Sequence, residues 1–115
     1  MAPKKIRYTS RSVEQHVDRP REDVWPAVLD MIRAWDPAAE LSVEMPWRVA
    51  YEMDTADTAL SFWQSTVLIR DDGPTCHVAW GLVFDPEPDA GALAAADDIV
   101  ERMRTDLGRL VTAVG

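Results

Sequence analysis

The chain has 115 residues, 47% of them hydrophobic, and its 20 acidic and 12 basic residues give a formal net charge of −8. This length suits one compact domain over residues 1–115, and the apolar content is too high for an intrinsically disordered chain. Such an acidic chain lacks the clustered Lys and Arg that bind a phosphate backbone, so we expect no nucleic-acid partner.

The first expected element is a strand over residues 7–17. One face of this strand would carry Val13, Gln15 and Val17. A helix follows, because Pro20 suits its first turn and apolar side chains then recur at three- and four-residue spacing as far as Trp35. Pro26 should kink or delay this helix, since proline has no amide hydrogen to donate.

Three antiparallel strands and a short additional one are expected next. The short strand covers residues 41–44, and the longer ones begin at Trp47, Leu60 and Thr75. Alternation places a set of apolar and small polar side chains on their inner faces: Trp47, Val49, Tyr51, Met53, Trp63, Ser65, Val67, Ile69, Cys76, Val78, Trp80, Leu82 and Phe84. The sequence Asp-Asp-Gly-Pro at 71–74 predicts the turn between the last two strands.

A long amphipathic helix should end the domain after the break at residues 85–88. Its apolar stripe consists of Leu93, Ala96, Ile99, Val100, Met103, Leu107, Leu110, Val111 and Val114. The predicted fold class is therefore α+β, with a curved antiparallel sheet of about five strands packed on a long C-terminal helix.

Three stretches of this sequence resemble the START-like superfamily, also called SRPBCC or Bet v 1-like, whose members have the helix-grip fold. They are HVDRPREDVW at 16–25, VEMPWRVAY at 43–51 and VLIRDDGPTCHVAW at 67–80. The chain is shorter than members of this superfamily usually are, because there is no room for an early hairpin between Trp35 and Trp47. The resemblance implies a short helix-grip domain with a reduced or more open cavity.

Few residues offer catalytic or metal-binding chemistry. The glycines are scattered and form no phosphate-binding loop, and no nucleophile elbow is present. Only His16, His77 and Cys76 could supply soft metal ligands, and Cys76 and His77 point to opposite faces of one strand. We therefore expect no metal site and no cofactor, and the sequence identifies no catalytic residue.

The inner faces of the predicted sheet carry a few polar groups among apolar ones, as small-molecule pockets do. The candidate ligand-binding residues are Gln15, Trp47, Tyr51, Met53, Trp63, Ser65, Trp80 and Met103. The same residues could equally form a filled core in which Tyr51 is hydrogen-bonded. Tyr51 and Gln15 would orient a ligand, and the tryptophans would provide stacking surface.

We expect a protein that binds a hydrophobic or aromatic small molecule between the sheet and the C-terminal helix. Two alternatives follow from the resemblance. One is an enzyme of the polyketide cyclase/dehydrase type, for which Tyr51 is the only inward-facing acid or base. The other is a non-catalytic interaction module of the Hsp90-activator or toxin type, in which an exposed edge strand or apolar patch is covered in a homodimer. With no membrane-spanning or signal-peptide run, we expect a cytoplasmic protein without membrane insertion.

Overall fold

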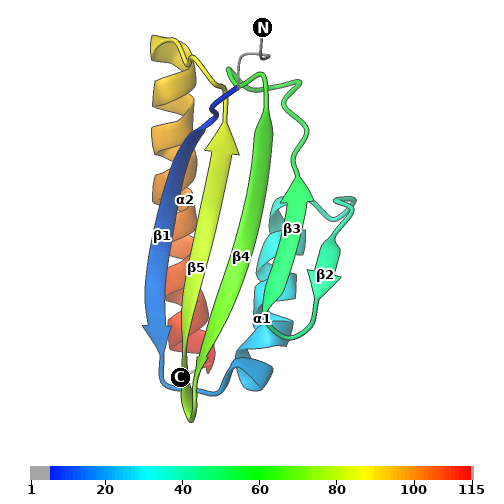
Figure 1. The fold of residues 1–115 in the computed structure, drawn as a ribbon, viewed down its shortest axis with the longest axis vertical. Coiled ribbons are helices and arrows are strands. Elements are labelled where there is room, and N and C mark those ends of the chain that lie inside the picture. Colours follow the sequence, from blue (N-terminus) through cyan, green and yellow to red (C-terminus); the bar gives the residue numbers. More distant parts are fainter. Residues whose placement is uncertain (1–5, 115) are drawn as a thin grey trace, which may run out of the picture.

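A five-stranded antiparallel sheet backed by two helices forms the domain (Figure 1). The computed structural model describes residues 6–114, so residues 1–5 and 115 of the predicted domain lie outside the described part. The elements are β1 (Thr9–Val17), α1 (Arg21–Trp35), β2 (Ser42–Glu44), β3 (Arg48–Glu52), β4 (Trp63–Asp72), β5 (Thr75–Phe84) and α2 (Ala90–Val114). The strand order is β1-β5-β4-β3-β2 and both helices lie on one face, which confirms the predicted α+β helix-grip arrangement.

The β4–β5 hairpin forms the centre of the sheet. Gly73 has a φ of 81° in its turn, a conformation that suits glycine, and its amide donates to Asp71 Oδ1. Because successive side chains alternate between faces, every second residue from Trp63 to Ile69 and from Cys76 to Phe84 is buried against the helices. The inner faces predicted for these two strands are confirmed.

Strand β4 begins at Trp63, three residues after the expected start at Leu60. The reason is a carboxylate: Asp85 Oδ1 accepts hydrogen bonds from the amides of Ser61 and Phe62 at 2.8 and 3.0 Å. These two amides are therefore satisfied without joining the sheet ladder. Asp85 also accepts a bond from Thr9 Oγ1 on its backbone oxygen, so it joins the starts of β1 and β4 to the end of β5.

The two helices differ from expectation in detail. Helix α1 begins at Arg21 and continues through the exposed Pro26, so this proline does not delay it. In α2, Ala92 and Ala96 are buried while Leu93 is 37% exposed, so the assignment of Leu93 to the apolar stripe is wrong. Ala92 lies four residues before Ala96 and shares its side of the helix, whereas Leu93 is turned away by about 100°. Within residues 6–114, neither helix has the length and apolar character needed to cross a membrane.

Both edges of the sheet leave expected inner-face residues uncovered. Trp47 is 41% exposed because it lies in the turn between β2 and β3, beside the sheet edge, and not in a central strand. Gln15 pairs with Val78 in the register, but it is exposed beside a cavity between the edge strand β1 and α2, whereas Val13 and Val17 on the same face are buried. The expectation that Trp47 and Gln15 are enclosed with the central residues is therefore wrong.

Candidate functional site

Four aromatic side chains meet at the centre of the inner sheet face. Tyr51 comes from β3, Trp63 from β4 and Trp80 from β5, and all three are at most 8% exposed. Trp35, the last residue of α1, covers them. Its ring centroid lies 6.0 Å from that of Trp63 and 5.4 Å from that of Trp80, both edge to face. We call these four residues the aromatic cluster.

The polar atoms of the cluster bond mainly to one another. Trp80 Nε1 donates to the Tyr51 hydroxyl at 2.9 Å, and Trp63 Nε1 donates to Ser65 Oγ at 3.2 Å. Ser65 is only 2% exposed and also hydrogen-bonds with Tyr51. Two indole N–H groups and two hydroxyls thus converge on one small region of an otherwise apolar surface, where an unpaired polar group would be costly.

Burial governs the acid–base behaviour of Tyr51. Desolvation raises its pKa above the usual 10.0, and the hydrogen bonds with Trp80 and Ser65 offset this only in part. A phenol held neutral in this way can donate or accept a hydrogen bond but is a poor general base near neutral pH. Within the described residues, the side-chain hydrogen-bond partners of Tyr51 are Trp80 and Ser65.

Trp35 is held by α2 on its outer side. Its Nε1 donates to Asp106 Oδ2 at 2.7 Å, and the Arg102 guanidinium carbon lies 3.8 Å from its ring centroid. Trp35 is half-buried, and α1 ends with this residue. It is therefore the outermost member of the aromatic cluster and the one with a route to solvent.

A cavity of about 290 Å³ lies beside Trp35, between the end of α1 and the loop that follows β3. Its lining consists of Trp35, Asp36, Met53, Asp54 and Asp57. Met53, a predicted ligand-binding residue, is half-buried here and not enclosed with Tyr51. The cavity adjoins the aromatic cluster at Trp35, and its lining combines two apolar side chains with three carboxylates.

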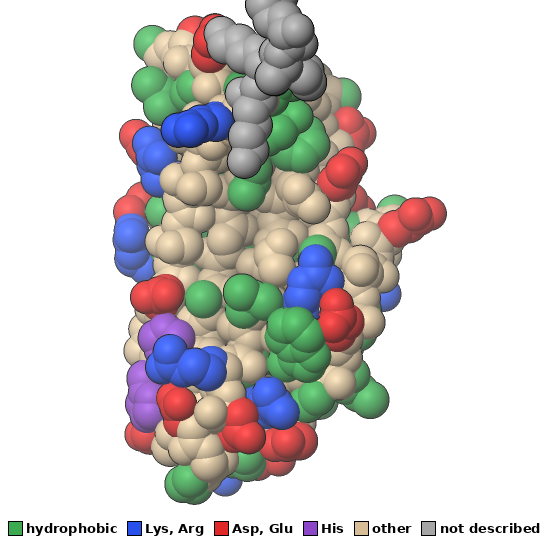
Figure 2. All heavy atoms as spheres, viewed as in Figure 1, with side chains coloured by type: hydrophobic (Ala, Val, Ile, Leu, Met, Phe, Trp, Pro, Cys, Tyr) green, Lys and Arg blue, Asp and Glu red, His purple; other side chains and the backbone are tan. Residues whose placement is uncertain are grey.

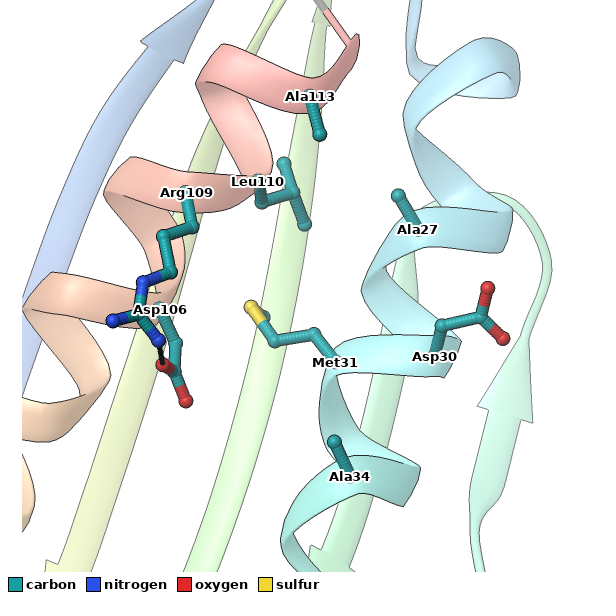
Figure 3. A pocket seen from close by; sticks show the side chains of 8 residues that line it. All are labelled: Ala27, Asp30, Met31, Ala34, Asp106, Arg109, Leu110 and Ala113. Carbon is teal, nitrogen blue, oxygen red and sulfur yellow. Dashed lines mark ion pairs between the residues drawn. The ribbon is translucent and has the colours of Figure 1, made fainter.

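A second, larger cleft of about 370 Å³ separates α1 from α2 (Figure 3). Met31 points into it from α1 and Leu110 from α2, and Asp30, whose carboxylate points away from α2, is also part of its lining. Asp106 borders this cleft, where its Oδ1 lies 3.7 Å from Arg109 Nη1. Asp106 therefore contacts both the cleft and the aromatic cluster.

The remaining predicted site residues are dispersed. Met103 is 1% exposed within the core under the sheet. Gln15 lines a separate cavity of about 350 Å³ between β1 and α2, together with Arg104. Trp47 is exposed at the β2–β3 turn. The structure thus brings together Tyr51, Trp63, Ser65 and Trp80, places Met103 in the same hydrophobic core, and leaves Gln15, Trp47 and Met53 nearer the surface.

Sequence reasoning missed the roles of Asp106 and Arg102. Both lie on α2 among charged residues that look like a solvated helix face. The available signal was spacing: Asp106 lies three residues after Met103 and one before Leu107, so it borders the apolar stripe. Its partner, Trp35, is 71 residues away in the sequence and could not be assigned from it.

Neither a protein-family model nor a curated protein matches this sequence. Solved structures do match its fold. An uncharacterised protein from Bacillus thuringiensis matches with a TM-score of 0.72 and 15% identity, over 92% of this chain and 98% of that one. A START superfamily protein from Mycobacterium smegmatis matches with a TM-score of 0.56 and 14% identity, over 92% and 99%. This chain has a START-like fold.

A third solved structure, a larger two-domain protein, also matches the fold of this chain. The di-domain aromatase/cyclase BexL matches with a TM-score of 0.66 and 16% identity, over 90% of this chain and 45% of BexL. The START-like domain described here therefore spans about half the length of BexL. At this level of identity the match concerns the fold alone.

Proposed function

We propose that this START-like domain binds a small hydrophobic or aromatic molecule between the sheet and α2, at the aromatic cluster. The observation that carries the proposal is the convergence of the Tyr51 and Ser65 hydroxyls with two indole N–H groups on the otherwise apolar inner face of the sheet. Small-molecule sites are commonly built from such an apolar lining with few polar groups. The START-like fold supports the same function.

A ligand would enter where Trp35 now lies. The cluster is filled by its own side chains, so a ligand needs space, and Trp35 is the half-buried member beside the 290 Å³ cavity. Rotation of Trp35 toward this cavity would break its bond to Asp106 and expose the edges of Trp63 and Trp80. The fitting ligand is a planar molecule of about the size of an indole, with one polar substituent that reaches Tyr51.

The experiment uses 1-naphthol, a planar apolar molecule with one hydroxyl. Binding to the full chain is measured by tryptophan fluorescence and by native mass spectrometry. Tyr51→Phe should weaken binding on the order of tenfold, because it removes a buried hydrogen-bond partner. Trp35→Ala should tighten binding, because the ligand no longer has to displace the indole ring. Tyr8→Phe is the matched control, since Tyr8 is the other tyrosine and is 47% exposed.

Three results would contradict the proposal. The first is that neither the parent nor the Trp35→Ala protein forms a complex with 1-naphthol. The second is that Tyr8→Phe weakens binding as much as Tyr51→Phe, and the third is that a folded Trp35→Ala variant binds more weakly than the parent. The last result would mean that Trp35 contacts the ligand and does not occupy its place.

A second candidate function rests on the apolar corner, which we define as Val43, Met45 and Trp47, in β2 and the turn that follows it. These side chains are 41–73% exposed. The corner lies at β2, an edge strand whose outer backbone groups have no partner strand within the described sheet. We propose that a second copy of the chain covers it by antiparallel pairing of the two β2 strands, which would set Val43 against Val43 of the second copy.

Sedimentation equilibrium at high micromolar concentration tests this homodimer. Met45→Lys and Val43→Lys should each shift a dimer toward monomer, whereas Leu93→Lys, at an exposed apolar residue on α2, should not. A parent protein that remains monomeric throughout the concentration range would refute the second candidate and leave the ligand proposal unaffected.

A further inference from the structure

The two histidines of this chain are neighbours on the outer face of the sheet. The antiparallel register of β1 and β5 sets His16 directly opposite His77. Their sequence neighbours Val17 and Cys76 are fully buried on the inner face, so both imidazoles lie on the face away from the helices. Figure 2 shows the pair side by side. Side chains at directly opposite positions have Cβ atoms about 4.5–5.5 Å apart.

Each imidazole has a carboxylate on the same ring nitrogen. His16 Nε2 lies 3.0 Å from Asp18 Oδ1, and His77 Nε2 lies 3.6 Å from Glu14 Oε1. The hydrogen bond with Asp18 favours the His16 tautomer in which Nε2 carries the hydrogen, which leaves the lone pair on Nδ1. Glu14 favours the same tautomer of His77 electrostatically, over a longer contact. Carboxylates placed in this way fix the tautomer and the ring orientation of metal-binding histidines.

The charges around the pair favour a bound cation. Glu14 and Asp18 contribute two negative charges beside the rings. The nearest basic group in the register is Arg70, which lies opposite His77 on β4, and its Nε is 3.4 Å from Asp72 Oδ1. Because the charge of Asp72 offsets that of Arg70, the net charge around the two histidines stays negative. Both rings are reachable, since the side chains of His16 and His77 are 55% and 27% exposed.

We propose that His16 and His77 form a two-histidine site for a divalent first-row transition metal, with water at the remaining positions. Within residues 6–114, no group of three or more His, Cys, Asp and Glu side chains is arranged to hold a metal ion, so the protein supplies two ligands. Imidazole suits Zn²⁺, Ni²⁺ and Cu²⁺, and Cu²⁺ should bind most tightly. This site is independent of the aromatic cluster on the opposite face.

Isothermal titration of the full chain with NiCl₂ tests the proposal. We expect one equivalent of Ni²⁺ to bind, with perturbed NMR signals from both imidazole rings. His16→Gln and His77→Gln should each weaken binding by about tenfold or more, because a second ligand on the same surface acts at a high effective concentration. The double variant should bind Ni²⁺ no more tightly than either single variant, because the chelate is already lost when one imidazole is removed.

The matched control keeps two histidines and separates them. Combining His16→Gln with Ser12→His moves one imidazole along β1 to a position opposite Gly81, four residues away on the same outer face. This variant should bind Ni²⁺ as weakly as His16→Gln. If it binds as tightly as the parent, or if either single variant keeps the parent affinity, the pair is not a chelate and the proposal is wrong.

Discussion

Asp85 is the residue whose replacement tests the architecture most directly. Its side chain accepts the Ser61 and Phe62 amides at 2.8 and 3.0 Å, and the residue is only 8% exposed. These bonds fix the backbone immediately before Trp63, so they position the start of β4 and with it the Trp63 side chain of the aromatic cluster. Asp85→Ala removes both bonds, whereas Asp85→Asn keeps an oxygen acceptor and removes only the charge.

The expected loss of unfolding free energy follows from these bonds. A hydrogen bond to a charged group contributes about 1.5–3 kcal/mol when buried. Ser61 is exposed and Phe62 is half-buried, so water can replace part of each bond in the alanine variant. We therefore expect Asp85→Ala to cost about 2–4 kcal/mol and Asp85→Asn about 1 kcal/mol. The loss expected for Asp85→Ala is a substantial part of the unfolding free energy of a domain, which is typically ~5–15 kcal/mol.

The effect should depend on pH in a defined direction. Burial raises the pKa of Asp85, but the hydrogen bonds from the backbone amides of Ser61 and Phe62 outweigh it and hold the pKa below the usual 3.8. A carboxylate with a depressed folded-state pKa stabilises the protein above its unfolded pKa, about 3.9. This contribution is lost as the pH falls through the lower folded value. The difference between the parent and Asp85→Asn should therefore be constant near neutral pH and shrink in acid.

Urea unfolding of the parent and both variants at pH 7, 5 and 3 measures these differences. Glu87→Gln is the control, because Glu87 is an exposed carboxylate in the same loop and its replacement should change stability by less than about 0.5 kcal/mol. The reasoning is refuted if Asp85→Ala and the parent unfold at the same urea concentration at pH 7. It is also refuted if the difference in unfolding free energy between the parent and Asp85→Asn grows as the pH falls.

One titration and three further substitutions have definite expected outcomes. Because the folded-state pKa of Tyr51 is raised, this phenol should stay neutral above pH 10 in an ultraviolet titration, and its contribution to stability should be lost as the pH rises from about 10 through the folded value. Gly73→Ala should destabilise by about 1 kcal/mol in urea because of its φ of 81°, whereas Gly108→Ala in α2, with open space around it, should stabilise by about 0.5–1 kcal/mol. Arg102→Ala should cost about 0.5–1 kcal/mol and change the fluorescence of Trp35, whose ring the guanidinium covers.

The central strands were predictable from sequence because their two faces differ so strongly in polarity. Alternation over residues 75–84 admits one register only, since a shift by one residue would turn every apolar side chain to solvent. The same pattern placed Tyr51, Trp63, Ser65 and Trp80 on one buried face. Their position together was therefore predictable, although whether this face binds a ligand stays a prediction.

Alternation fails at the sheet edges for a physical reason. It assigns a residue to a face but does not say whether anything covers that face. Gln15 and Trp47 lie at opposite edges of the sheet and remain exposed, although they continue the inner-face pattern. Leu93 was assigned to the wrong side of α2 for a similar reason. Which side of the first helical turn faces the sheet depends on how α2 packs against it, and the sequence pattern does not give this.

The sequence alone determined the α+β class, the order of the elements, the central hairpin and the acidic exterior, because each depends on local periodicity or on composition. Tertiary structure decided which distant residues meet. Asp106 reaches Trp35 across 71 residues, and Thr9 reaches Asp85 across 76. It also decided that the two histidines lie opposite each other. Such pairings depend on the register and docking of whole elements, and those follow from the packing of the complete core and not from any one segment.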